Sequence, residues 1–146
     1  MAGASAGGYL AAATETVSGL DESDEDLFIS SKPNLNLLYY PVLDNGPDGY
    51  GSTEMKARYL EVCRIHNVGA TNPSTLLLLG TEDPFLSVQK EMKYKSLLEG
   101  KGISYKVKLY QGAGHPIFYY RQGGSSDYFK MLHDSEGFLR RRGYLQ

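Results

Sequence analysis

The segment Gly3-Ala4-Ser5-Ala6-Gly7 fits the pattern Gly-x-Ser-x-Gly, in which a serine sits on a sharp turn between a strand and a helix. The turn brings backbone atoms close together, so we expect Gly3 and Gly7 to stand where a Cβ atom would collide. The alanine-rich residues 6–15 are typical of a helix packed closely on a sheet. With 17 glycines in the chain, the pattern alone is weak, and Ser5 as an ordinary helix N-cap is the alternative.

The composition is that of a globular protein and restricts the function. With 146 residues, 41% of them hydrophobic, the chain can form one modest domain with its own core. A net charge of −2 argues against a nucleic-acid partner, and we assign Arg140-Arg141-Arg142 to the negative end of a helix dipole. No apolar segment approaches the length of a membrane span. The cellular location stays open.

The cysteine and histidine residues give no sign of a metal or cofactor. Cys63 is the only cysteine, so no disulfide can form within the chain. The three histidines lie far apart in sequence, and none belongs to a pair with the spacing of metal ligands. We therefore predict neither a metal site nor a cofactor. The acidic residues 21–26 are interpreted as a solvated loop, because they lack the ligand pattern of a calcium-binding loop.

Turn residues divide the remaining chain into alternating extended and helical patterns. The run Thr75-Leu76-Leu77-Leu78-Leu79 is typical of a strand covered on both faces in a parallel sheet. Alternating polarity over residues 103–110 indicates a strand near a sheet edge. We expect strands over residues 35–42, 75–79 and 103–110, and helices over residues 6–15, 53–64, 87–99 and 126–142. The alternation predicts an α/β fold of parallel strands with flanking helices, in a single domain over residues 1–146.

Helical periodicity also predicts which side chains of three helices face the core. The expected inward residues are Met55, Tyr59, Leu60 and Cys63 in the first of them, Val88, Met92, Leu97 and Leu98 in the next, and Tyr128, Phe129, Leu132 and Leu139 in the last.

Two polar residues follow successive predicted strands and complete a chemical pattern with Ser5. Asp83 follows the strand 75–79, and His115 follows the strand 103–110. In parallel α/β sheets, reacting groups lie on loops beyond the carboxyl ends of the strands. A histidine can take the proton of a serine hydroxyl, and a carboxylate can orient that histidine. We therefore predict Ser5 as nucleophile, His115 as base and Asp83 as its partner, with Glu82 as the rival acid.

The other two histidines are not expected to take part in this chemistry. His66 ends the predicted helix 53–64, and His133 lies within the last helix. The paired tyrosines of the chain, Tyr39-Tyr40 and Tyr119-Tyr120, are interpreted as core or surface aromatic residues.

These residues carry a resemblance to a known superfamily. The chain resembles the C-terminal half of an α/β-hydrolase of the esterase/lipase type, near the carbohydrate-esterase-like and prolyl-oligopeptidase-like branches. The matching segments are Gly3 to Gly8, Gly80 to Pro84, Tyr110 to His115 followed by Phe118, and Tyr40 to Pro47. The resemblance implies a serine hydrolase that cleaves small-molecule or carbohydrate esters through an acyl-enzyme. It also implies that the N–H of Ala6 contributes to the oxyanion hole.

The chain departs from this family in two ways. Pro116 stands where the family commonly has glycine, and it stiffens the histidine loop. The first strands, the strand into Ser5 and the His-Gly-Gly-type oxyanion loop have no counterpart in the sequence. We therefore expect a partial domain with an unpaired sheet edge that permits self-association. Two alternatives stay open, a catalytically incompetent half-domain and a peptidase of the prolyl-oligopeptidase type.

Overall fold

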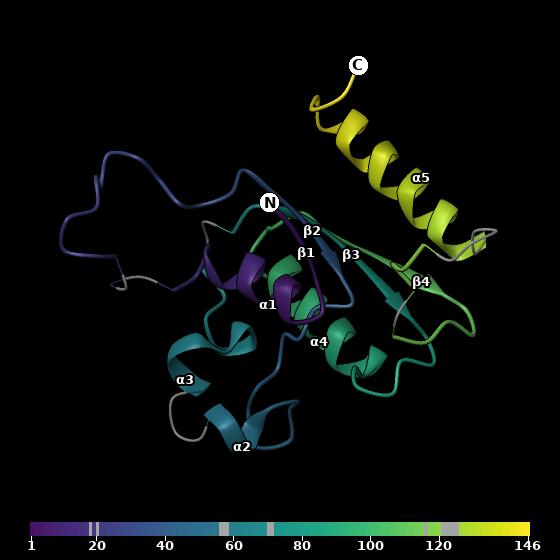
Figure 1. The fold of residues 1–146 in the computed structure, drawn as a ribbon, viewed down its shortest axis with the longest axis horizontal. Helices are drawn as coiled ribbons and strands as arrows, with labels where there is room; N and C mark the ends of the chain where they lie inside the picture. The colour runs from purple at the N-terminus through teal and green to yellow at the C-terminus, as the bar shows by residue number, and fades with distance from the viewer. Residues whose placement is uncertain (18, 20, 56–58, 70–71, 116, 121–125) are drawn as a thin grey trace.

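A four-stranded parallel sheet forms the centre of the computed structural model, which describes residues 1–17, 19, 21–55, 59–69, 72–115, 117–120 and 126–146. The strands are β1 (Ala2–Ala4), β2 (Leu35–Tyr39), β3 (Ser74–Gly80) and β4 (Tyr105–Tyr110), and they lie side by side in chain order (Figure 1). Leucines 76–79 of β3 are almost inaccessible to solvent, as expected for a central strand covered on both faces. The predicted parallel α/β architecture is confirmed, and β4 lies at an edge as predicted.

The strand β1 corrects one expectation from the sequence. Three residues form a parallel ladder with β2, in which Ala2 pairs with Leu37 and Ala4 pairs with Tyr39. The N–H of Leu37 also donates to the carbonyl of Met1, at 3.0 Å. A short strand therefore does lead into Ser5. It escaped prediction because three small residues carry no alternating pattern.

Helices cover both faces of the sheet. The long helices are α1 (Ala6–Ala13), α4 (Val88–Glu99) and α5 (Ser126–Arg141). Neighbouring side chains of a strand point to opposite faces. On β2, Asn36 donates to Glu15 just beyond α1, whereas Tyr39 bonds Ser135 of α5. Helices α1 and α5 therefore lie on opposite faces, in agreement with Figure 1.

The segment predicted as one helix over residues 53–64 is divided. It forms α2 (Ser52–Met55), α3 (Tyr59–Val62) and the 3₁₀ helix η2 (Arg64–His66), and residues 56–58 lie outside the described part. Cys63 is buried as predicted, but Leu60 is 55% exposed, so its predicted inward orientation is wrong. The Met55 side chain was predicted to face the core, and it is not among the side chains that the structure describes.

The inward faces of α4 and α5 also differ from prediction. On α4, Leu98 is buried as predicted, but Met92 and Leu97 are exposed, and Glu91 and Tyr94 are buried instead. On α5, Phe129 and Leu132 are exposed, and the buried residues are Met131, Ser135 and Phe138. In both helices the buried stripe includes polar residues, which a purely apolar periodicity does not identify.

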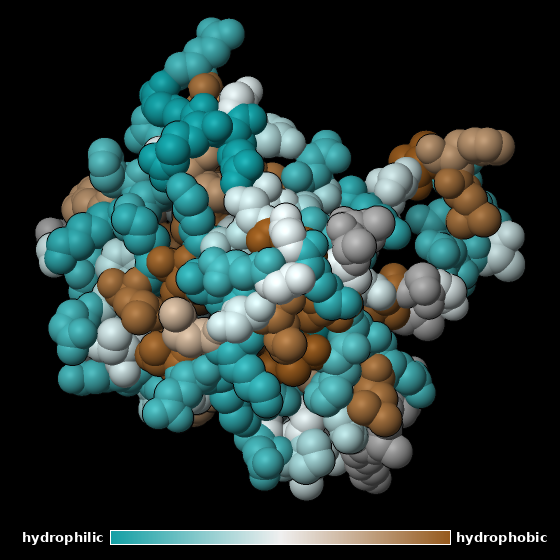
Figure 2. All heavy atoms as spheres, turned by 180° about the vertical axis from the view of Figure 1, so that it is seen from behind, coloured by the Kyte–Doolittle hydropathy of each residue, from teal (hydrophilic) through white to brown (hydrophobic). Residues whose placement is uncertain are grey.

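The acidic segment is a solvated loop, as predicted. Every residue from 21 to 31 is exposed, including Leu27, Phe28 and Ile29. This loop extends away from the sheet in Figure 1, and hydrophobic atoms lie at the end of the projecting segment in Figure 2. Across the described residues, no three His, Cys, Asp or Glu side chains are arranged to hold a metal ion. Within the same residues, no helix combines the length and the apolar character needed to cross a bilayer.

Candidate active site

Ser5 occupies a strained turn between β1 and α1. Its φ of 52° and ψ of −120° lie in a region that residues with a Cβ rarely adopt, at a cost of about 1–3 kcal/mol. The surroundings hold this conformation, since the Ser5 N–H donates to the carbonyl of Tyr39 at 2.9 Å and its carbonyl accepts from Tyr9 at 3.0 Å. The sequence between strand and helix therefore presents the Ser5 hydroxyl at the carboxyl end of the sheet.

The glycines around Ser5 do not play equivalent roles. A Cβ atom on Gly3 would lie 2.2 Å from the carbonyl oxygen of Gly7, so Gly3 is required by the close approach of strand and helix. A Cβ on Gly7 would meet no atom within 4 Å, and the expectation that it would collide is wrong. Gly8, which the sequence did not single out, faces Pro41, where a Cβ would lie 2.9 Å from the proline Cβ.

Asp83 and His115 meet beyond the ends of β3 and β4. The Oδ2 atom of Asp83 lies 2.7 Å from Nδ1 of His115, and Nε2 of His115 lies 2.8 Å from Oγ of Ser5. The other carboxylate oxygen of Asp83 accepts the N–H groups of Phe85 and Leu86, at 2.9 and 3.1 Å. The structure thus brings the three predicted residues into one hydrogen-bonded chain. Glu82, the rival acid, points to solvent.

The end of β3 holds the two loops together. A Cβ on Gly80 would lie 2.1 Å from the carbonyl oxygen of Ala113, so the histidine loop packs directly on the strand end. The N–H of Glu82 donates to that same carbonyl at 3.0 Å, and the N–H of Gly112 donates to Oγ1 of Thr81 at 2.9 Å. These contacts fix the separation of the loops that carry Asp83 and His115.

Aromatic rings enclose the imidazole of His115. The ring of Tyr40 lies 4.6 Å from it, and the ring of Phe85 lies 5.0 Å away, edge to face. Tyr40 is buried, and its backbone φ is 37°. Burial raises the pKa of its hydroxyl to about 12, so this side chain is neutral near pH 7. The sequence identified Tyr40 only as an aromatic of the core or surface. Tyr40 falls within the strand predicted over residues 35–42, whereas β2 ends one residue earlier, at Tyr39.

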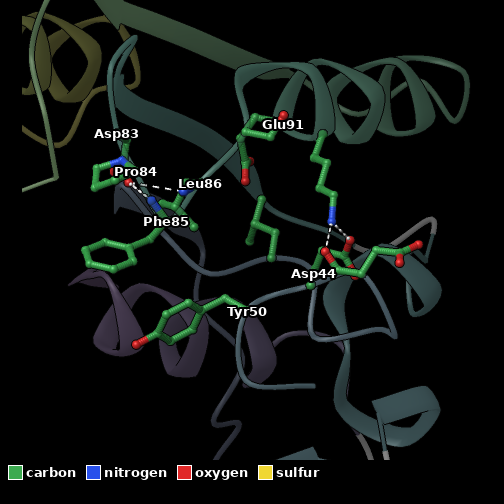
Figure 3. A pocket seen from close by; sticks show the side chains of 12 residues that line it. Asp44, Tyr50, Asp83, Pro84, Phe85, Leu86 and Glu91 are labelled. Carbon is green, nitrogen blue, oxygen red and sulfur yellow. Dashed lines mark hydrogen bonds and ion pairs between the residues drawn. The ribbon is translucent and has the colours of Figure 1, made fainter. Parts of the chain in front are cut away.

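Two cavities lie next to the hydrogen-bonded residues Ser5, Asp83 and His115. One of about 500 Å³ is lined by Ala6, Tyr9, Val42, Asn45, Tyr50, Gly51 and Thr53. A second, of about 350 Å³, lies on the side of Asp83 and Phe85 and is drawn in Figure 3. Tyr50 lines both. The first cavity includes the residue that follows Ser5, so a molecule within it would lie beside the serine.

The remaining residues singled out from the sequence lie elsewhere. His66 is exposed at the end of η2, with its ring against Tyr59 at 5.4 Å, and His133 is exposed on α5. Neither joins the Ser5 chain of hydrogen bonds. Cys63 is fully buried. Pro116 lies outside the described residues, so its predicted effect on the histidine loop stays a prediction.

A family model agrees with this arrangement. Residues 1–141 match the model of the prolyl oligopeptidase family. The chain belongs to this family. Among curated proteins, no sequence matches.

Solved structures give a second comparison. The chain is similar to esterase 2 of Thermogutta terrifontis in its apo form, with 29% identity, a TM-score of 0.89, and coverage of 99% of this chain and 56% of the esterase. The same esterase phosphoramylated by tabun is similar with 28% identity and a TM-score of 0.88, and the match covers 99% of this chain and 55% of the esterase. For its propionate-bound form the identity is 28% and the TM-score 0.87, with coverage of 99% of this chain and 56% of the esterase. This member of the prolyl oligopeptidase family thus has the fold of an α/β-hydrolase and spans about half the length of the esterase.

Proposed function

We propose that the chain carries the catalytic centre of a serine hydrolase that cleaves carboxylic esters through an acyl-enzyme. The observation that supports this most directly is the continuous chain of hydrogen bonds from Ser5 through His115 to Asp83. A serine hydroxyl is a weak nucleophile until a base accepts its proton, and this arrangement supplies the base and fixes its orientation.

In the proposed reaction, Oγ of Ser5 attacks the ester carbonyl while Nε2 of His115 takes its proton. Asp83 accepts the hydrogen bond from the Nδ1–H of His115, which selects the tautomer and stabilises the imidazolium. The N–H of Ala6, at the positive end of α1, donates to the oxyanion. His115 then protonates the departing alcohol. A water molecule, deprotonated by His115, then attacks the acyl-enzyme in the same way and releases the carboxylic acid and free Ser5.

Ester hydrolysis is supported by the similar structures. The esterase from Thermogutta terrifontis is recorded with propionate bound and with organophosphorus groups attached. Since the present chain shares 28% identity with it, we infer a similar preference for small acyl groups. The cavity of about 500 Å³ beside Ala6 has room for such a group.

Hydrolysis of peptide or aminoacyl amide bonds is the second candidate, and the name of the matched family favours it. The two candidates share the acyl-enzyme and differ in the leaving group. Turnover of p-nitrophenyl propionate against an aminoacyl p-nitroanilide distinguishes them.

A half-domain without turnover is a further candidate. Within the described residues we assign one oxyanion donor, the N–H of Ala6. The loss of one such donor lowers kcat by about 10²–10³-fold in other serine hydrolases. Measurable labelling of Ser5 with turnover below detection would support this candidate.

The decisive experiment is labelling with a fluorophosphonate. We expect one label per chain, located at Ser5 by peptide mapping, and none after Ser5→Ala. Ser23→Ala, in the exposed acidic loop, is the matched control and should label normally. Labelling that persists in Ser5→Ala would refute the assignment of the nucleophile.

A further inference from the structure

Glu91 of α4 has a buried carboxyl group, one oxygen of which has no hydrogen-bond partner among the described residues. Glu91 is 3% exposed, and that oxygen is Oε2. A buried polar atom without a hydrogen-bond partner destabilises the folded state, and such atoms are rare in folded proteins. The catalytic scheme proposed above makes no use of Glu91, so its position requires a separate explanation.

The unpaired carboxyl group faces a cavity. Glu91 lines the space of about 350 Å³, and Figure 3 shows its side chain pointing from α4 toward the region bordered by Leu86 and Tyr50. The rings of Tyr50 and Phe85 line the same space and contact each other edge to face, with centroids 5.7 Å apart. The cavity therefore offers one buried polar group and an aromatic wall, a combination typical of small-molecule sites.

The charges around this cavity favour a cation. Among the described residues, Lys90 is the one cationic side chain that lines it, and its ammonium group is already held by Asp44 at 2.9 Å and by the backbone carbonyl of Asp48. Burial alone would raise the pKa of Asp44, but hydrogen bonds from Lys90 and Gly46 outweigh it and lower that pKa. Asp44 thus neutralises Lys90, and the carboxyl groups of Asp48 and Glu91 remain for a ligand.

We propose that this cavity binds a small organic molecule with a primary ammonium group, which bonds Glu91 while its apolar part rests on Tyr50 and Phe85. An ammonium group donates hydrogen bonds and has no acceptor, which suits an unpaired carboxylate oxygen. Aromatic faces attract cations and pack on apolar groups. The site is separate from the proposed nucleophile, although Asp83 contributes to both.

Binding of the ammonium ligand is coupled to the release of a proton from Glu91. Burial raises the pKa of Glu91 to about 8, and the charges of Asp44 and Asp83 act in the same direction, so the empty site holds a neutral acid at pH 7. Binding of an ammonium ion favours the carboxylate, and the proton of Glu91 passes to solvent. Among the described residues, the titratable and charged groups near Glu91 are Asp44, Asp48, Asp83, Lys90, Tyr94 and Tyr105.

Isothermal titration calorimetry with benzylammonium tests the proposal, with uncharged benzyl alcohol as comparator. At pH 7, in two buffers of different ionisation enthalpy, we expect binding with release of about one proton. Affinity should rise nearly tenfold from pH 6 to 7 and about fivefold from pH 7 to 8, because the ionised fraction of Glu91 rises by these factors when its pKa is about 8. Benzyl alcohol should bind at least tenfold more weakly.

Variants locate the binding. Glu91→Gln should lower the affinity at least tenfold and abolish proton release, whereas Glu99→Gln, at an exposed position of the same helix, should change neither. Ser5→Ala should also bind benzylammonium with unchanged affinity, so the test of this site does not depend on whether Ser5 is the nucleophile. Unchanged binding by Glu91→Gln, equal binding of benzyl alcohol, or no binding would overturn the proposal. If Glu91→Gln fails to fold, proton release by the native protein decides.

Discussion

Asp83 contacts His115 through Oδ2 at 2.7 Å, whereas Glu82, one residue earlier, points to solvent. The difference arises at the end of β3. There the N–H groups of Phe85 and Leu86 bind the second oxygen of Asp83 and turn its carboxylate inward. Two adjacent acidic residues therefore have different surroundings, and the pair offers a controlled test of the proposed site.

Asp83→Asn is expected to lower kcat for a p-nitrophenyl ester by about 10⁴-fold, because an amide stabilises the wrong tautomer of His115. Glu82→Gln removes one carboxylate from the adjacent position and should retain activity within about twofold. Steady-state kinetics with both variants checks this. Comparable losses in the two variants would contradict the assignment of Asp83.

Gly3→Ala and Gly7→Ala form a second matched pair. The added methyl group at Gly3 would lie 2.2 Å from the Gly7 carbonyl oxygen, and we expect a loss of about 1–3 kcal/mol in the free energy of unfolding together with loss of fluorophosphonate labelling. At Gly7 the methyl group meets nothing within 4 Å. Gly7→Ala should be neutral or stabilise α1 by up to about 1 kcal/mol. Urea denaturation of both variants measures the difference, and equal destabilisation would refute the geometry of the turn.

The sequence predicted the site more completely than the packing around it. Asp83 and His115 could be placed because each lies on a loop that follows a predicted strand, and parallel strands bring their carboxyl ends to one edge. Ser5 was identified from the Gly-x-Ser-x-Gly pattern alone. Tyr40 and Glu91 were missed since their roles depend on contacts between distant elements. The face of α4 was assigned from apolar residues alone, yet its buried stripe includes Glu91 and Tyr94. The short β1 was missed because its small residues form a strand only through pairing with β2.

A buried ion pair on the face opposite α5 should contribute strongly to stability. Arg64 pairs with Glu15, both nearly inaccessible, and Glu15 also accepts from Asn36 at 2.6 Å and Asn72 at 3.1 Å. Glu15→Gln leaves the guanidinium buried without its counter-charge, so we expect a loss of about 3–5 kcal/mol in the free energy of unfolding.

The exposed pair of Glu136 and Arg140 on α5 provides the control for this prediction. Glu136→Gln should change the free energy of unfolding by at most about 0.5 kcal/mol, because water screens an exposed pair. Denaturation curves of the two variants are compared at the same pH. Similar losses in the free energy of unfolding would show that the buried pair stabilises the fold no more than the exposed pair does.

Glu91 should make stability depend on pH in a direction opposite to that of most carboxyl groups. Its pKa is about 8 in the folded chain against 4.5 as its ordinary value, so the folded state binds the additional proton between these two pH values. Stability then falls as pH rises from about 4.5 to 8, by at most about 1.4 kcal/mol per unit. Glu91→Gln should flatten this dependence and exceed the native protein in stability at pH 9. A parallel pH profile of the two proteins, from urea midpoints, would contradict the assignment.

The outer edge of β1 is expected to promote self-association. In the described sheet β1 pairs with β2 alone, and it carries no charged residue, whereas the opposite edge strand β4 carries Lys106 and Lys108. Lysines on an edge strand oppose pairing with another chain. We expect sedimentation velocity to detect dimers that increase with concentration, and Ala2→Lys to reduce them. Ser23→Lys adds the same charge in the exposed loop and should leave the dimers unchanged. If both lysine variants lower the dimer fraction equally, net charge rather than the β1 edge controls association.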